Sequence, residues 1–143
     1  MKNWIIILLM GSIGNLCAQK TDSISEETIY SFVELNPEWK DGQEALYGYL
    51  STNIHYPKEA LQKCVSGKVY LQFIVEKDGS INQDVKIIRG IGNGCDEEAL
   101  RVVKNMPAWN PGKQNGKPVR VYFTLPIKFE IPADCTPVPQ NDK

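Results

Sequence analysis

The chain has 143 residues, of which 42% are hydrophobic and 23% are charged, an ordinary composition for one globular domain. Its 16 Lys and Arg residues against 17 Asp and Glu residues give a formal net charge of −1, so a basic nucleic-acid binder is not expected. The single histidine excludes a multi-histidine metal site. The length allows a real hydrophobic core but not a cofactor domain beside a large active-site cavity, and we expect no cofactor.

Residues 1–18 have the layout of a secretory signal peptide. Lys2 gives the positive start, residues 4–10 form an unbroken apolar run, and the small residue Ala18 stands before the expected cut. Two alternatives stay open. One is a short uncleaved anchor in the inner membrane, and the other is lipidation at Cys17, although the residue before that cysteine is not small.

Three cysteines remain after such a cleavage, namely Cys64, Cys95 and Cys135, so at most one internal disulfide can form. Export permits its oxidation. Cys64 and Cys95 flank the same predicted hairpin, which makes a disulfide between these two residues one candidate. The alternative is that either is a small buried side chain. No CxxC spacing supports a zinc or redox site, and no metal site is expected.

The first third of the chain changes from a polar lead-in to helical patterns. Residues 19–40 are polar with scattered apolar positions and predict a loose lead-in, with one short extended stretch at 28–33. Apolar side chains at helical spacing predict a helix over 41–51, with Asn53 as its stop. Pro57 suits the first position of a second, short helix, where its missing N–H is not needed.

A hairpin is predicted in the middle of the chain. Residues 68–76 alternate between apolar and polar side chains, which is typical of a strand with one buried face. Asp78-Gly79 indicates a tight turn, because glycine accepts positive φ. Residues 81–89 then return as the second strand, and the glycine-rich stretch 90–94 is expected to be a flexible connection.

The last third predicts a helix and a long strand. The helix starts at Asp96, whose carboxylate is expected to accept hydrogen bonds from the first-turn N–H groups, and it ends before Pro107. The prolines and glycines of 109–118 predict a loop, and the strict alternation of 119–129 predicts a strand. The proline-rich tail 132–143 is expected to be extended or disordered.

These elements predict an α+β domain over residues 41–131. Two helices pack on a three-stranded antiparallel sheet in the order helix, strand, strand, helix, strand. Catalysis is not expected, because His55 lacks a second histidine and the run Asp96-Glu97-Glu98 is explained by the charge preference of a helix N-terminus. The chain is therefore interpreted as a non-enzyme.

Pro126 interrupts the otherwise ideal last strand. Proline cannot donate a ladder hydrogen bond, so it predicts that this strand lies at an edge of the sheet. Such an edge is either blunted against aggregation, which fits Pro126 and Lys128, or used for docking. In the second case an extended peptide could add a strand along Val119–Leu125.

A series of short motifs spreads over residues 41–129. They are Tyr56-Pro57-x-x-Ala60, Gly67-Lys68-Val69, Phe73-x-Val75-x-x-Asp78-Gly79, Cys95-Asp96-Glu97-Glu98-Ala99, Met106-Pro107-x-Trp109-x-Pro111-Gly112, Gly116-x-Pro118-Val119 and Phe123-x-Leu125-Pro126-Ile127-x-Phe129. Together they resemble the TonB C-terminal domain family, in the form common in Bacteroidetes-type bacteria. The resemblance implies a two-helix, three-stranded fold, which matches the predicted order of elements.

The resemblance also implies a function. TonB proteins span the periplasm from an inner-membrane motor complex to outer-membrane transporters. Their C-terminal domain, which is not catalytic, captures the transporter's short N-terminal segment, the TonB box, by strand addition to the last strand. Carried over to this chain, the peptide-binding residues are Val119, Arg120, Val121, Tyr122, Phe123, Thr124 and Leu125, together with Asn53 and His55 just before the Tyr-Pro motif and Tyr56 within it.

The first hypothesis is therefore a periplasmic, stand-alone module that binds an extended peptide of an outer-membrane transporter. The short lead-in 19–40 stands where a force-transmitting TonB has a long proline-rich spacer, so energy coupling by this chain alone is not expected. Two alternatives remain. One is an energy transducer that keeps its N-terminal segment as an anchor and contacts the motor complex, and the other is a structural homodimer with paired edge strands.

Overall fold

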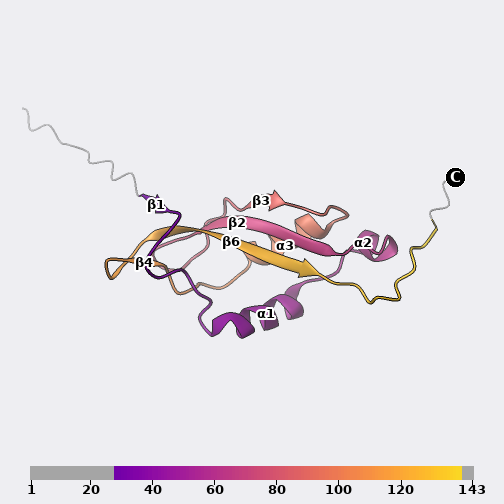
Figure 1. Cartoon of the computed structure of the whole chain (residues 1–143), viewed down its shortest axis with the longest axis horizontal. Helices are drawn as coiled ribbons and strands as arrows, with labels where there is room; N and C mark the ends of the chain where they lie inside the picture. The colour runs from indigo at the N-terminus through magenta and orange to yellow at the C-terminus, as the bar shows by residue number, and fades with distance from the viewer. Residues whose placement is uncertain (1–27, 140–143) are drawn as a thin grey trace, which may run out of the picture.

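Two long antiparallel strands form the centre of the structure, a computed structural model that describes residues 28–139 (Figure 1). Strand β2, Gly67–Val75, pairs with strand β6, Arg120–Phe129, in an unbroken register from Gly67–Phe129 to Val75–Val121. The expected signal segment 1–18, including Cys17, lies outside the described residues.

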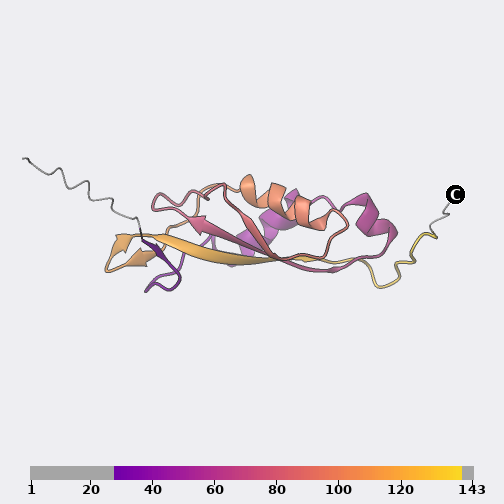
Figure 2. The ribbon, with the colours of Figure 1, turned by 90° about the horizontal axis from the view of Figure 1, so that it is seen from above.

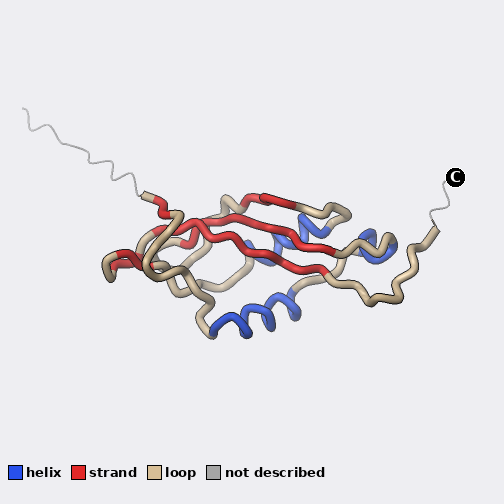
Figure 3. Tube along the Cα trace, viewed as in Figure 1, coloured by secondary structure: helices blue, strands red, loops and turns tan. Residues whose placement is uncertain are grey.

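Two short strands complete the sheet. Strand β3, Lys86–Arg89, pairs antiparallel with β2, and strand β1, Ile29–Tyr30, pairs parallel with the start of β6. The resulting order is β1-β6-β2-β3, with the strands drawn in red in Figure 3. The predicted antiparallel core of three strands is confirmed, and the two-residue strand β1 falls within the extended stretch predicted at 28–33.

Within residues 28–139, all helices lie on one face of this sheet (Figure 2). They are α1, Gly42–Asn53, the short α2, Lys58–Gln62, and α3, Cys95–Lys104. Figure 1 shows α1 running alongside β6, at the flank of the sheet where β6 lies. The predicted α+β class, with helices packed on one face of an antiparallel sheet, is confirmed. Among the described residues, no helix has the length and apolar character needed to cross a membrane.

The core lies between the helices and the sheet. The alternation read from the sequence buries every second side chain of β2 and β6, and the apolar stripe of α3 packs against them. Trp109 is only 2% exposed and makes edge-type contacts with the rings of Trp39, Phe73 and Phe123. The main buried residues are Leu46, Leu50, Val69, Leu71, Phe73, Val75, Ala99, Val102, Val103, Val121, Leu125, Ile127 and Phe129.

Two segments differ from the sequence prediction in detail. Within 109–118, expected as a loop, a small hairpin pairs β4, Lys113–Gln114, with β5, Lys117–Pro118. Its turn residues, Asn115 and Gly116, both have positive φ, the conformation that an Asn-Gly pair favours. The predicted strand 81–89 is shorter than expected, since regular pairing with β2 resumes only at β3.

The lead-in is ordered from residue 28 onward, which corrects the expectation of a loose segment up to residue 40. Besides β1, Leu35 forms two backbone hydrogen bonds with Lys113, and Glu38 forms two with Asn110. These tertiary hydrogen bonds hold the segment against the 110–113 region, and no local pattern in the sequence announces them.

The disulfide joins Cys64 to Cys135, so the predicted pairing of Cys64 with Cys95 is wrong. Cys95 is fully buried, and it shares the inward stripe of α3 with Ala99, four residues later. Burial raises the pKa of its thiol to about 11, with the carboxylates of Asp96 and Glu97 adding to the effect.

The same disulfide corrects the expectation of a disordered tail for residues 132–139. Cys135 is bonded to the segment that follows α2, and the backbone N–H of Val138 donates to the carbonyl of Gln62 at 2.9 Å. The tail is thereby fastened to the α2 end of the molecule, where Figure 1 shows it leaving the sheet.

The start of α3 also differs from expectation. Gly94, with φ of 84°, precedes the helix, and the Asp96 carboxylate does not cap the first turn. It accepts hydrogen bonds from the N–H groups of Ile91, at 2.8 Å, and Gly92, at 3.3 Å, in the preceding loop. Asp96 therefore fixes the path of the connection between β3 and α3.

Candidate functional site

The backbone of β6 has a side that faces away from β2. The N–H of Asn82 donates to the carbonyl of Ile74, so the backbone polar groups of Ile74 point toward β3 rather than β6. Ile74 is paired with Tyr122, and in an antiparallel ladder both members of such a pair point outward. Because the register is unbroken, every second residue of β6 has the same orientation, namely Arg120, Tyr122, Thr124, Pro126 and Lys128.

This orientation explains the position of Pro126. Its missing N–H lies on the outer side of β6, so no hydrogen bond to β2 is lost. The prediction that proline marks an edge strand holds for only part of β6. Within residues 28–139 the sheet order places β6 between β1 and β2, but β1 pairs only with Arg120 and Val121, so no strand pairs with the outer side of β6 at Pro126.

Strand β1 covers the first part of that outer side. Its parallel pairing of Tyr30 with Val121 engages the outward backbone groups of the two residues flanking Val121. Beyond β1, no strand within residues 28–139 pairs with this side of β6. We call the outer side of residues 123–128 the open edge; it offers the N–H and carbonyl groups of Thr124 and Lys128 and the carbonyl of Pro126.

A groove runs between the open edge and α1. Its first part has a volume of about 340 Å³ and its second part about 450 Å³, and Tyr47 and Pro126 line both parts. The first part lies beside Trp39, Leu46, Trp109, Phe123 and Leu125, and the second beside Leu50, Ile54, Tyr56, Ile127 and Phe129. The walls from α1 and residue 39 were not among the predicted site residues, because their place beside β6 depends on the tertiary fold.

The predicted peptide-binding stretch Val119–Leu125 is only partly open. The N–H of Val119 donates to the carbonyl of Gly112 at 3.0 Å, and Arg120 and Val121 pair with β1. The side chains of Val121 and Leu125 are buried in the core, whereas those of Tyr122 and Thr124 are exposed on the face without helices. Among the seven residues of this stretch, only Phe123, Thr124 and Leu125 lie in the open edge.

Arg120 is further fixed by an ion pair across β2 and β6. Its Nε donates to Glu76 Oε2 at 2.6 Å, and its Nη2 donates to Glu76 Oε1 at 3.0 Å. This hydrogen bonding holds the pKa of Glu76 below its usual value, with a further hydrogen bond from Asn82. The pair fastens the start of β6 to the end of β2.

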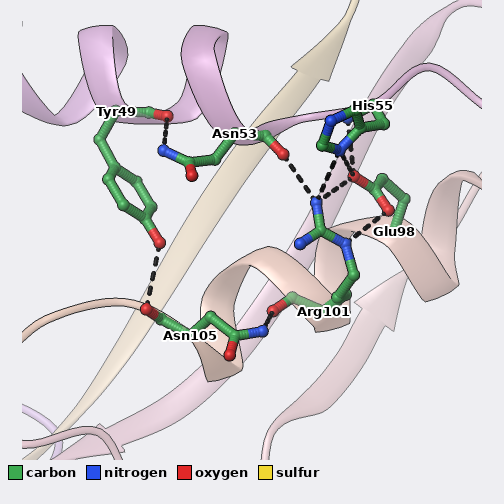
Figure 4. Close-up of polar contacts among 6 residues, drawn as sticks. All are labelled: Tyr49, Asn53, His55, Glu98, Arg101 and Asn105. Atoms are coloured by element: carbon green, nitrogen blue, oxygen red, sulfur yellow. Dashed lines mark hydrogen bonds and ion pairs between the residues drawn. The ribbon is translucent and has the colours of Figure 1, made fainter.

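Asn53 and His55 belong to a polar network between α1 and α3 (Figure 4). Arg101 Nη2 donates to the carbonyl of Asn53 at 2.7 Å and to Glu98 Oε1 at 2.6 Å. The N–H of His55 donates to the same Glu98 oxygen at 2.7 Å. Hydrogen bonds from Arg101 lower the pKa of Glu98. Tyr49 adds a second link between α1 and α3, because its hydroxyl donates to the carbonyl of Asn105 at the end of α3.

Tyr56 is the member of the predicted trio that reaches β6. Its ring packs edge-on against Phe129, with centroids 5.6 Å apart, and its hydroxyl donates to the carbonyl of Val65. It lines the far part of the groove, near the end of the open edge. The structure thus places Tyr56 at one end of the groove and the stretch Val119–Leu125 at the other, with Asn53 and His55 engaged with α3.

These features define a class of protein. It is a small α+β domain in which the outer side of one long strand, β6, keeps backbone N–H and carbonyl groups available to another strand. A family model for the Gram-negative bacterial TonB protein C-terminal region matches residues 52–131. The chain belongs to this family. Members take part in TonB-dependent transport in the Gram-negative envelope, where such domains interact with outer-membrane TonB-dependent transporters and have no catalytic role.

Two solved structures resemble the fold, and both are NMR solution structures of the Helicobacter pylori TonB-CTD. The first is 22% identical, with a TM-score of 0.47 over 61% of this chain and 90% of that chain. The second is 23% identical, with a TM-score of 0.45 over 62% of this chain and 79% of that chain. No curated protein matches this chain.

Proposed function

We propose that this chain is a periplasmic module that captures an extended segment of an outer-membrane transporter by strand addition along the open edge of β6. One observation carries the proposal. Thr124, Pro126 and Lys128 turn their backbone groups away from β2, and no strand within residues 28–139 pairs with them. Such an edge is a template for one more strand.

The edge suits an incoming strand in two respects. It lies next to β1, a short strand that already pairs parallel to β6, so a parallel segment can continue in the same line toward Lys128. Pro126 has no N–H and so donates no hydrogen bond to an incoming strand, but its carbonyl can still accept one. The family's role in transport supplies the partner, a transporter segment in extended conformation.

Both described ends of the chain leave the open edge uncovered. After Tyr30 the chain turns away from β6 to reach Lys113, and the disulfide holds the tail near α2. The open edge therefore has no competing segment within residues 28–139. This arrangement supports capture of a segment from another molecule.

Replacement of one exposed residue tests the proposal. Thr124→Pro removes an outward N–H from the middle of the open edge, whereas Thr124→Val changes the side chain and keeps that N–H. We expect peptides that tile the N-terminal segments of TonB-dependent transporters to bind the wild type and Thr124→Val, and to bind Thr124→Pro at least tenfold more weakly. Equal binding by Thr124→Pro, with an unchanged circular dichroism spectrum, would show that the edge is not used.

A further inference from the structure

We propose that the first part of the groove is a selectivity pocket, which accepts one bulky apolar side chain of the strand captured at the open edge. The inference rests on the proposed function, because the pocket is filled only when a strand lies along β6. It adds a requirement on the partner's sequence that strand addition alone does not make, since backbone hydrogen bonds are the same for every residue.

The lining of this pocket selects apolar ligands. Trp39, Leu46 and Tyr47 form the side next to α1, and Phe123 and Leu125 form the side of β6. Glu38 is the one charged residue among the described residues that line it. A volume of about 340 Å³, at the lower end of the ~300–1,000 Å³ typical of ligand sites, leaves room for one large apolar side chain.

The alternation of side chains brings the captured strand to this pocket. Along β6, the side chain of Thr124 points to the face without helices, whereas Phe123 and Leu125 point to the helix side. These two residues line the pocket together with Pro126. A strand added next to β6 continues the same pleat, so every second side chain lies on the helix side. There it meets the flank of α1, where Tyr47 is 55% exposed.

The geometry favours a single extended segment over a second copy of the chain. In Figure 1, α1 lies along the same flank of the sheet as the open edge. Two copies paired through β6 would each bring an α1 helix to the shared edge, while one added strand needs a spacing of only about 4.8 Å. The chain's own tail is held near α2 by the Cys64–Cys135 disulfide.

A peptide series tests the pocket on protein purified from cells that express the full chain. The probes are capped dodecapeptides with threonine at one set of alternate positions and valine at the other, and lysine at both ends. In matched pairs, one valine is replaced by phenylalanine or by alanine at each position in turn. Amide signals of Thr124 and Lys128 report strand addition, and the indole N–H signals of Trp39 and Trp109 report filling of the pocket.

We expect one position at which phenylalanine binds at least tenfold more tightly than alanine, since burial of a large apolar side chain supports a factor of that size. Tyr47→Ala should reduce this ratio below threefold. Ile88→Ala, which removes a 58% exposed apolar side chain on β3, should leave it unchanged.

The possible failures are distinct. If Thr124 and Lys128 shift with every peptide but phenylalanine and alanine bind equally at all positions, the pocket is refuted and strand addition stands. If no peptide shifts these amides, the proposed function itself fails. If sedimentation shows a dimer whose dissociation parallels peptide binding, a second copy occupies the edge and the pocket proposal is overturned.

Discussion

The Cys64–Cys135 disulfide makes a quantitative prediction about stability. The two residues are 71 positions apart, so their bond closes a loop around most of the described domain in the unfolded chain. The chain-entropy relation for a loop of this length gives about 4 kcal/mol of stabilisation. The double replacement Cys64→Ser/Cys135→Ser, which removes the bond and leaves no odd thiol at either position, should lower the free energy of unfolding by about this amount.

Urea unfolding followed by circular dichroism measures the loss. With a slope of about 2 kcal/mol/M, the midpoint should fall by about 2 M in the double variant. The urea midpoint of the wild type should fall by a similar amount in a strong reductant, whereas the midpoint of the double variant should not change.

A midpoint that moves by less than about 0.3 M would refute the entropic reasoning. Peptide mapping under non-reducing conditions gives a second check. It should find Cys64 linked to Cys135, and a bond to Cys95 would contradict the structure itself.

Other positions give further predictions. Gly79→Ala should lower the free energy of unfolding by at least about 2 kcal/mol, because φ is +85° and an added Cβ would lie 1.8 Å from the Trp109 carbonyl oxygen. Gly92→Ala, at φ +71° but in open space, should lower it by only about 1 kcal/mol. Glu76 has a lowered pKa in the fold, so its stabilisation holds above pH 4.5 and is lost as pH falls below it; Glu76→Gln should flatten that acid limb in urea unfolding measured against pH. Cys95 should resist iodoacetamide until urea unfolds the chain, as mass spectrometry will show, since it is buried with a pKa of about 11.

The regular elements could be predicted because each carries its own periodic pattern. The alternation of 68–76 and 119–129 corresponds to β2 and β6, and the apolar stripe after Asp96 corresponds to α3. Pro126 also marked a part of β6 whose outer side no strand within residues 28–139 covers, since the outward position of its nitrogen follows from the chemistry of proline alone. These signals are local, and they need no knowledge of the partners in space.

The features that the sequence did not predict correctly depend on tertiary contacts. Two residues of β1 carry too little pattern to reveal which strand they join. The disulfide partner of Cys64 depends on where the tail lies, and of the two alternatives for Cys95 the structure shows the small buried side chain. The hairpin at 113–118 was signalled by Asn115-Gly116, a turn pair that prolines nearby masked.

The same reason explains why the surroundings of the predicted site residues could not be read from the sequence. β1 lies beside β6 and covers Arg120 and Val121, so the open part of the outer side of β6 lies closer to Lys128 than predicted. Asn53 and His55 were carried over from the family resemblance, and in this chain they hydrogen-bond with residues of α3. Which residues of a strand are open to a new partner depends on which other strands pair with it, and only the folded chain shows this.

Amide hydrogen exchange along β6 tests the central claim most directly. In the unbound protein, Thr124 and Lys128 should exchange much faster than Phe123, Leu125 and Ile127, whose N–H groups face β2. On binding of a transporter's N-terminal segment, the first two amides should become protected while the other three stay so. Strong protection of Thr124 and Lys128 before binding, or no gain after it, would contradict capture by strand addition.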